Sequence, residues 1–290
     1  MRVDVVGSTG VLGRALIPAL LEHQHEVLAL ARSPTKAHKL LPKEAEIVQS
    51  DLLSPGIGEQ LPTLLTGCEA VFHIATAIPS DMTSPHAWDT NTRLRTEGTS
   101  VLLQASVKAG VKRYIQQSIT MAYPDCGDEW ITEVHPLDTS PRRALICKPV
   151  ITMENLVRRL THHEMQWCIL RGGSFVGPGT AQDRTIADLR AGRHVVAGRG
   201  QNFVSLIHVA DMAAACVAAL AHAPHGSVFN IVDEPIREGD YLDRMADSMG
   251  VARPRRDETV PASPSWRCSN RLAKSTLFWS PCHQVIRLQP

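Results

Sequence analysis

The stretch Val3-Asp4-Val5-Val6-Gly7-Ser8-Thr9-Gly10-Val11-Leu12-Gly13 decides the fold of this chain. Its first four residues are typical of a short strand, its glycines recur at every third position, and a stretch of helical period follows at once. Glycine here permits a tight turn, lets the backbone approach a pyrophosphate, and lets the helix pack close to the sheet with its N-terminal amides facing the phosphate. A glycine-rich turn without a ligand is the alternative, but the strand-turn-helix context favours a dinucleotide-binding loop.

Outward from this loop, short β-branched runs alternate with longer stretches of helical period, which is the pattern of a parallel sheet with helices on its faces. Strands are expected at 3–6, 26–31, 45–49, 70–75, 113–117 and 166–170, and helices at about 11–23, 92–109, 149–162 and 210–221. Beyond these strands the order becomes less regular, and glycine and proline cluster at Gly172-Gly173 and Gly177-Pro178-Gly179. The sequence therefore predicts an α/β fold with a doubly wound parallel sheet, followed by a substrate-specific part.

Composition and charge narrow the class of ligand. The 290 residues are 43% hydrophobic and 20% charged, close to the average for globular proteins, which argues against a disordered, collagen-like or disulfide-scaffold protein. The 30 Lys and Arg balance 29 Asp and Glu to a net charge of +1. This balance does not indicate nucleic acid or an anionic membrane surface as the partner. The expected partner is a small-molecule substrate.

The cysteines and the N-terminus indicate a compartment. Seven cysteines are scattered along the chain, and no C-x-x-C pair suggests zinc or a redox motif, so we expect reduced thiols and no metal site. The start lacks the basic and apolar regions of a signal peptide, and no apolar run approaches the roughly 18 residues that span a bilayer. A soluble, cytoplasmic protein is the expectation.

The position about 20 residues beyond the glycine-rich loop indicates which dinucleotide binds. In the usual dinucleotide fold an acidic side chain there holds the ribose 2′-hydroxyl, whereas this sequence has Arg32. A guanidinium can clamp a 2′-phosphate with paired hydrogen bonds, and Lys36 adds charge, so NADP(H) is favoured over NAD(H); a solvated basic loop is the alternative. Asp51 and Leu52 follow the third strand and are candidates to meet the adenine, although a turn-capping role also explains Asp51.

With these motifs the chain resembles an extended or atypical short-chain dehydrogenase/reductase of the NAD-dependent epimerase/dehydratase type, over nearly its whole length. The motifs that carry the resemblance are weak singly and specific in their order. They are Gly7 to Gly13, Val71 to Ala75, Asn91, Gly98-Thr99, Ala109 to Arg113, Ile131-Thr132-Glu133, Leu170-Arg171, Gly177-Pro178-Gly179, Ile207 to Asp211, and Phe229-Asn230-Ile231.

The resemblance implies a domain plan. Residues 1–171 would form an NADP-binding Rossmann core, and residues 172–290 mainly a small C-terminal substrate-binding lobe, with some segments returning to the core. Within this plan His208 is structural and not catalytic. The family often forms homodimers through the helices near 92–109 and 149–162.

The family's catalytic pattern is altered in this sequence. Family members carry a catalytic tyrosine four residues before a lysine, so that the ammonium lowers the phenol pKa and grips the nicotinamide ribose. Lys148 matches the lysine, but Ala144 stands at the tyrosine position, and a surface lysine with matching spacing is the alternative for Lys148. The accompanying hydroxyl position, counted back from Tyr123, falls on Ile119 between Ser118 and Thr120.

Two classes of function remain open. The first is an NADP-dependent oxidoreductase that acts on a carbonyl or an activated double bond, with a proton from a hydroxyl or a bound water. The second is a catalytically altered member with non-redox or epimerase-like chemistry, or an NmrA-like redox sensor that binds NADP without turnover. The candidate catalytic residues are Ser118, Thr120, Tyr123 and Lys148. The candidate cofactor-binding residues are Gly7, Thr9, Gly10, Val11, Leu12, Gly13, Arg32, Lys36, Asp51, Leu52, Ala75, Thr76 and Lys148.

Overall fold

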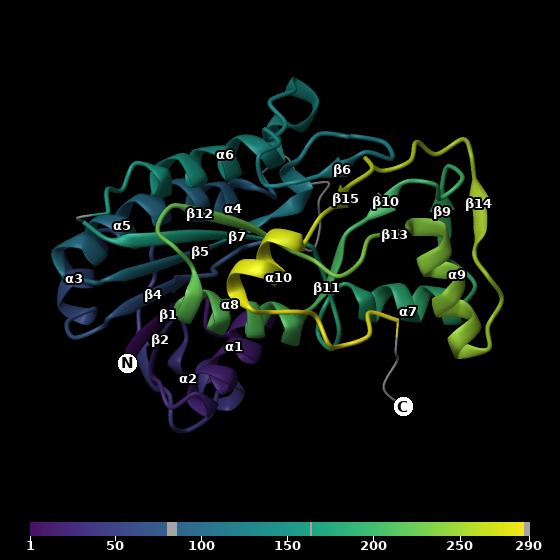
Figure 1. Cartoon of the computed structure of the whole chain (residues 1–290). Coiled ribbons are helices and arrows are strands. Elements are labelled where there is room, and N and C mark those ends of the chain that lie inside the picture. The colour runs from purple at the N-terminus through teal and green to yellow at the C-terminus, as the bar shows by residue number, and fades with distance from the viewer. Residues whose placement is uncertain (80–85, 163, 287–290) are drawn as a thin grey trace. The chain divides into compact units, whose positions relative to one another are not determined.

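The computed structural model describes residues 1–79, 86–162 and 164–286, and a seven-stranded sheet is its central element (Figure 1). The strands are β1 (Arg2–Val6), β2 (Glu26–Ala31), β3 (Glu46–Gln49), β4 (Ala70–His73), β5 (Arg113–Ile119), β7 (Gln166–Gly172) and β12 (Ser227–Ile231). Their order is β12-β7-β5-β4-β1-β2-β3, and the pairings from β3 to β5 are parallel. The order reverses between β1 and β4, which is where open parallel sheets bind their ligands. The predicted doubly wound fold is confirmed.

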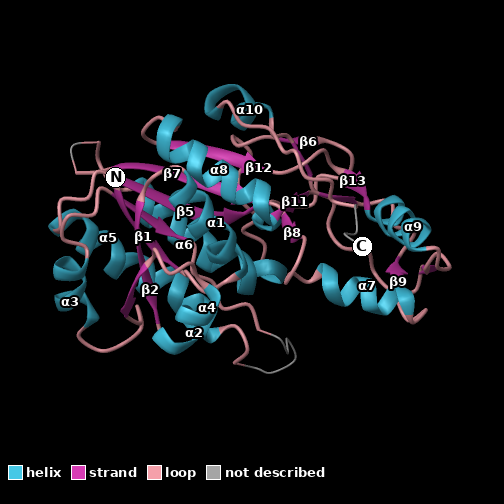
Figure 2. Ribbon diagram, turned by 90° about the horizontal axis from the view of Figure 1, so that it is seen from below, coloured by secondary structure: helices cyan, strands magenta, loops and turns pink. Residues whose placement is uncertain are grey.

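Helices lie on both faces of this sheet, with α1 and α8 on one face and α3, α5 and α6 on the other (Figures 1 and 2). The helices that connect its strands are α1 (Val11–Glu22), α2 (Pro34–Leu40), α3 (Ile57–Leu64), α4 (Asp89–Arg93), α5 (Thr99–Lys108), α6 (Ala144–Arg158) and α8 (Val209–His222). Leu61 of α3, Leu102 of α5 and Val157 of α6 are fully buried in one apolar cluster with Val71 and Tyr114 of the sheet. In the described part of the chain, no helix is both long and apolar enough to cross a membrane.

The helix expected at 149–162 has different bounds. It begins at Ala144 and ends at Arg158, so Pro149 lies inside it and not at its start. Proline favours the first turn of a helix because it lacks an amide hydrogen, which is why the sequence pointed to a later beginning. Burial of Cys147, Val150 and Met153 along one face outweighs that preference.

The helix expected at 92–109 is three consecutive helical segments. Between α4 and α5 the chain forms a π-helix, η1, from Leu94 to Gly98, in which Arg95 and Gly98 are buried. A π-helical turn holds about one residue more than an α-helical turn and is frequently found at functional sites. The short helices α2 and α3 were not predicted, because neither has a long apolar period.

The chain forms two compact units. Unit 1 consists of residues 1–118, 138–170 and 213–228, and unit 2 consists of 119–137, 171–212 and the residues from 229 onward. The expected boundary after residue 171 lies beside one of the points where the chain passes between the units, at Leu170 and Arg171. The chain also passes between them after residues 118, 137, 212 and 228.

In its described residues, unit 2 contains small two-stranded sheets and three α-helices of its own. Its helices are α7 (Gln182–Arg190), α9 (Glu238–Met249) and α10 (Arg271–Leu277). Its two-stranded sheets pair β8 (Ser174–Val176) with β11 (Leu206–His208), β6 (Trp130–Ile131) with β15 (Arg267–Cys268), β9 (Val195–Ala197) with β14 (Arg255–Asp257), and β10 (Phe203–Val204) with β13 (Ile236–Arg237). Only the last pair is antiparallel. Two apolar clusters stabilise this unit, one around Met245 and one around Tyr123.

A buried carboxyl group lies in β1. Asp4 is fully buried, and neither side-chain oxygen has a hydrogen-bond partner among the described residues. Burial raises the pKa of Asp4 well above its ordinary value of 3.8, and the nearby backbone amide of Val5 offsets this only in part. The folded protein therefore holds this proton over a pH range in which the unfolded chain has released it.

We expect Asp4 to make the protein less stable as pH rises. Because the pKa of Asp4 is higher in the native state, its contribution lowers the free energy of unfolding as pH rises. This decrease begins near the unfolded pKa of 3.8 and ends above the native pKa. Asp4→Asn removes this dependence, so its stability relative to wild type should increase with pH, by at most about 1.4 kcal/mol per pH unit. Urea unfolding from pH 4 upward measures the difference, and Glu44→Gln, at an exposed position, controls for loss of a carboxylate. Parallel profiles of Asp4→Asn and wild type would contradict the expectation.

Candidate functional site

The glycine-rich loop forms a tight turn between β1 and α1. Gly7 has a φ of +99°, and the amide of Gly10 donates to the carbonyl of Gly7 at 3.0 Å. Ser8 is buried and its hydroxyl donates to the carbonyl of Leu30 at 2.9 Å, which ties the loop to β2. Gly10 is the N-cap of α1 and supplies no side chain to cap it. The first amides of α1 are therefore available to an anion such as a phosphate.

The three glycines of the loop have different steric surroundings. A Cβ at Gly7 would lie 2.7 Å from the backbone of Ala75, and a Cβ at Gly13 would lie 2.3 Å from the carbonyl oxygen of Ser8. A Cβ at Gly10 would approach only the Gly7 carbonyl, at 3.2 Å. Gly7 and Gly13 are thus required by the fold itself, whereas at Gly10 the protein leaves room for a ligand.

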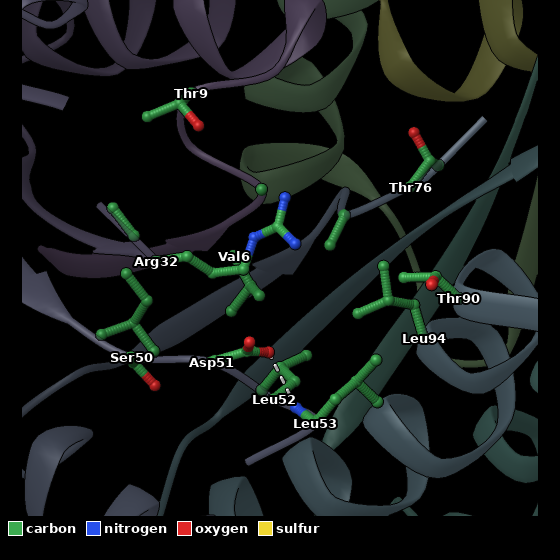
Figure 3. Close-up of a pocket in the computed structure, with 14 residues that line it drawn as sticks. Val6, Thr9, Arg32, Ser50, Asp51, Leu52, Leu53, Thr76, Thr90 and Leu94 are labelled. Atoms are coloured by element: carbon green, nitrogen blue, oxygen red, sulfur yellow. Dashed lines mark hydrogen bonds between the residues drawn. The ribbon is translucent and has the colours of Figure 1, made fainter. Parts of the chain in front are cut away.

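A pocket opens beside the loop, at the carboxyl ends of β1, β2, β3 and β4 (Figure 3). Among the residues expected to bind the cofactor, Arg32, Asp51, Leu52 and Ala75 line this pocket beside the loop. Arg32 follows β2, and Figure 3 shows its side chain extending into the middle of the pocket. The structure therefore brings these residues together with Gly7 and Thr9, around a space that belongs wholly to unit 1.

The remaining predicted cofactor residues lie at or near this pocket in different ways. Thr76 is part of its lining, and Val11 and the buried Leu12 begin α1. Lys36 is exposed on α2 and is not part of the lining. Asp51 also caps a turn, because its carboxylate accepts the amide of Leu53 at 3.0 Å.

Sequence reasoning did not identify Ser50, Thr90 and Leu94, which also line this pocket. The hydroxyl of Ser50 is buried and has no hydrogen-bond partner among the described residues. An orphaned hydroxyl in the wall of a pocket is available to a polar ligand. Together with the uncapped amides at the start of α1, this hydroxyl gives the residues present polar groups that fit a dinucleotide.

The lysine expected to be catalytic lies on α6, a helix that also carries a buried carboxylate. Ala144 and Lys148 are four residues apart on this helix, hence one turn apart, and Lys148 is exposed. Ser118, at the end of β5, is buried and donates its hydroxyl to Glu154 of α6 at 2.7 Å. Arg158 contacts the other oxygen of Glu154 at 3.4 Å. The structure thus joins Ser118 to the helix that carries Lys148, through a bond to Glu154 that the sequence did not predict.

A buried arginine adds charge to this region of unit 1. Arg95, in the π-helix η1, is 4% exposed and contacts the sulfur of Met153 at 3.5 Å. Burial lowers the pKa of Arg95 to about 10, and the charge of Glu154 partly opposes that effect. A buried cation and a buried carboxylate are thus held on neighbouring helices.

The other two candidate hydroxyls belong to unit 2 and are also buried. Thr120 donates to the carbonyl of Gly172 at 3.3 Å. The phenol of Tyr123 donates to Asn230 at 2.9 Å and accepts from Arg171 at 2.6 Å. Burial raises the pKa of Tyr123, against the lowering effect of Arg171. This geometry suits a residue that organises unit 2, because its proton is already committed to an acceptor.

The family can now be identified. A parallel sheet with a glycine-rich turn after β1, and a pocket at the carboxyl ends of four strands, define a doubly wound α/β protein of the dinucleotide-binding class. The model of the NAD dependent epimerase/dehydratase family matches residues 3–232, and the chain belongs to this family. The resemblance inferred from the sequence is confirmed. The prediction of an enzyme from a family of NAD(P)-dependent oxidoreductases and epimerases is confirmed as well.

Named relatives include two reductases. The chain is 31% identical over 311 residues to the 3-diazoavenalumate denitrifying reductase of a Streptomyces species, covering 99% of this chain and 98% of that protein. It is 26% identical over 258 residues to the 4-hydroxy-2-methyl-3-oxo-4-farnesyl-3,4-dihydroquinoline-1-oxide ketoreductase of Stigmatella aurantiaca, covering 87% of this chain and 74% of that protein.

Solved structures show the same fold at lower identity. The dTDP-glucose 4,6-dehydratase DesIV of Streptomyces venezuelae, with NAD bound, has a TM-score of 0.82 at 20% identity and covers 98% of this chain and 93% of its own. The UDP-glucuronic acid 4-epimerase of Bacillus cereus, in complex with UDP-glucuronic acid and NAD, has a TM-score of 0.78 at 22% identity. The match covers 98% of this chain and 95% of the epimerase chain. These likenesses concern the fold.

We expect Gly10→Val to abolish cofactor binding without unfolding the protein. Gly10 has extended backbone angles, which valine also adopts, but the new side chain would fill the space beside the α1 amides. Affinity for NADPH and NADH should fall more than about tenfold, a loss of about 1.4 kcal/mol. Gly13→Ala is the contrast, because its Cβ would overlap backbone and should prevent folding. Nucleotide fluorescence and circular dichroism measure the two effects; undiminished binding by a folded Gly10→Val would show that the loop is only a turn.

Proposed function

We propose that this protein is an NADPH-dependent reductase that transfers hydride to a small, electron-poor organic substrate without a tyrosine acid. The observation that carries the proposal is Ala144 on α6, one turn before the exposed Lys148. Lys148 holds the family's position for gripping the nicotinamide ribose, while the group that normally supplies a proton is missing. The reduced nicotinamide supplies the hydride when the cofactor is bound.

Arg32 supports NADP(H) as the cofactor. Its guanidinium extends into the pocket beside the glycine-rich loop, at the position where an acidic side chain would select NAD(H) (Figure 3). A 2′-phosphate there would meet a planar cation able to form two charge-assisted hydrogen bonds. Asp51 lines the same pocket, but its carboxylate already accepts the amide of Leu53.

The hydroxyl groups near the end of β5 constrain how a proton reaches the product. Ser118, Thr120 and Tyr123 are buried, and each donates to an acceptor of the protein. Use of any of them as general acid would break that bond and leave a buried acceptor unpaired, at a cost of about 1–3 kcal/mol. A bound water is therefore the proton source that we propose when the product is an alkoxide or an enolate, as it is for carbonyl or activated double-bond substrates.

A diazo-derived substrate is the second candidate, and the missing acid favours it. An aryl diazonium carbon that accepts hydride forms a C–H bond while the C–N bond breaks, and N2 leaves with the bonding electrons. The product is neutral, so no oxyanion needs a proton. The 31% identical relative is named as a denitrifying reductase of 3-diazoavenalumate, a name that joins a diazo compound to reductive loss of nitrogen.

Arg32→Ala should weaken NADPH binding by more than about tenfold, and leave NADH binding nearly unchanged, because only the 2′-phosphate requires the guanidinium. Arg32→Glu should reverse the preference, since a carboxylate repels the phosphate. Lys39→Ala, an exposed cation on the neighbouring α2, is the matched control. Calorimetric titration with both nucleotides tests this; equal affinities in the wild type, or a preference for NAD(H), would refute NADP(H) selection.

Ala144→Tyr should restore an acid and thereby distinguish the substrate classes. With a carbonyl substrate we expect NADPH oxidation to rise at least about tenfold, since general acid catalysis contributes about 10² to 10⁴. With an aryl diazonium substrate the rate should not change, because no proton is transferred. Ala144→Phe adds the ring without the hydroxyl and is the control.

The assay is NADPH oxidation against panels of carbonyls, enones and aryl diazonium salts. Equal gains from Ala144→Tyr and Ala144→Phe would mean that the hydroxyl does not act as an acid at this position. If neither the wild type nor Ala144→Tyr turns over any panel member, and NADPH instead changes the affinity for another protein, the NmrA-like sensor would replace the reductase as the function.

A further inference from the structure

Three side chains with metal-binding atoms meet in unit 2, apart from the residues discussed above. Asp211 lies in the first turn of α8, while Cys282 and His283 belong to the segment that follows α10. The Asp211 side chain is 1% exposed, that of His283 is 49% exposed, and Cys282 is exposed. The cluster therefore has a buried carboxylate at its base and opens to solvent at the thiol and the imidazole.

The three ligand atoms already have the spacing of a coordination site. Asp211 Oδ1 lies 2.8 Å from His283 Nδ1 and 3.3 Å from Cys282 Sγ, and these last two atoms are 3.4 Å apart. Ligand atoms around tetrahedral Zn²⁺, with bonds of about 2.0–2.3 Å, are about 3.3–3.7 Å apart. The three atoms thus form nearly one face of such a tetrahedron, and only the Asp–His separation needs to widen by about half an ångström.

The hydrogen bonds within the cluster favour replacement of protons by a cation. A carboxylate only accepts, so Nδ1 of His283 and Sγ of Cys282 both donate to one oxygen, which also accepts the amide of Cys282 at 3.1 Å. A divalent ion that takes the place of these protons releases the thiol proton of Cys282 to solvent and leaves His283 neutral, with its ring proton on Nε2. A carboxylate, a thiolate and a neutral imidazole then carry a total charge of −2, which balances the ion.

The ligand types select the metal. Thiolate and imidazole favour Zn²⁺ and similar borderline ions, whereas Ca²⁺ and Mg²⁺ require oxygen ligands. Three protein ligands leave the fourth tetrahedral position to a water, which the solvent-exposed side of the cluster can supply.

Neighbouring groups hold the ligands in place before any ion arrives. The ring of His208 stacks on that of His283, with centroids 4.7 Å apart and planes 11° from parallel. The indole of Trp279 donates to the carbonyl of Asp211 at 3.1 Å, and the amide of His283 donates to Asp211 Oδ2 at 3.0 Å. Such outer contacts orient metal ligands and strengthen binding.

We propose that Asp211, Cys282 and His283 bind Zn²⁺ or a similar divalent transition-metal ion, which fastens the C-terminal segment to the first turn of α8. The site is independent of the nucleotide pocket, which belongs to unit 1. Its ligands lie 71 residues apart in the sequence, so a bound ion would cross-link two distant segments of unit 2.

Titration of the metal-free full-length protein with Co²⁺ tests the proposal. One equivalent should produce the intense visible bands of tetrahedral cobalt and a near-ultraviolet thiolate-to-cobalt charge-transfer band, and Zn²⁺ should abolish both. Cys282→Ser should remove the charge-transfer band, and both Cys282→Ser and His283→Ala should weaken Zn²⁺ binding by more than about 100-fold. The His283 side chain is 49% exposed and Cys282 is exposed, so circular dichroism should show folded variants.

Cys126→Ser, a partly exposed thiol of unit 2 outside the cluster, is the matched control and should behave as the wild type. As a second readout, Zn²⁺ should raise the unfolding temperature of the wild type but not of Cys282→Ser. Absence of stoichiometric Co²⁺ binding would overturn the proposal. So would a charge-transfer band that persists in Cys282→Ser or disappears in Cys126→Ser.

Discussion

The close approach of two backbone segments, at Gly7 and Ala75, is the constraint on which the nucleotide site depends. No side-chain carbon fits at Gly7, because it would lie 2.7 Å from the Cα and the amide nitrogen of Ala75. This proximity, with the bond from the amide of Ile74 to the carbonyl of Val6, brings the ends of β1 and β4 together. The chain must therefore turn sharply after β1, and α1 begins with its amides unsatisfied at the point where strand order reverses.

Polar groups around the end of β5 are paired with one another before any substrate binds. Ser118 with Glu154, and Tyr123 with Asn230 and Arg171, are buried bonds within their respective units. Such networks rigidify their surroundings, because breaking one bond leaves a buried partner unsatisfied. With alanine at position 144, α6 carries Lys148 without the family's tyrosine, and the hydroxyl of Ser118 is already bonded to Glu154. Chemistry that makes little demand on an acid is consistent with this arrangement.

Features that depend on neighbours in the sequence could be predicted, and those that depend on distant residues could not. The strand at 3–6 and the helix from Val11 follow from local periodicity, and spacing alone singled out Gly7 and Arg32, which both line the pocket. Glu154 carries no such signal, because its partner Ser118 is 36 residues away.

The same reason explains other omissions. Ser50 is an ordinary residue after a strand until the fold places its hydroxyl in a pocket wall. The sequence also indicated no metal ligands, since a search for closely spaced cysteines cannot find Asp211 beside Cys282. The beginning of α6 was misplaced for a different reason: local proline preference yielded to burial of one helix face.

The π-helix η1 makes one wall of the nucleotide pocket adjustable by evolution. Its extra residue rotates α4, which precedes it, about the helix axis relative to α5. As a result Thr90 and Leu94 line the pocket, while Leu102 and Leu103 of α5 remain in the core. Deleting one residue from Leu94–Gly98 would turn α4 by about 100° about the helix axis, at 3.6 residues per turn. A single-codon insertion or deletion can thus exchange the side chains that face a bound nucleotide, and leave the packing of α5 against the sheet intact.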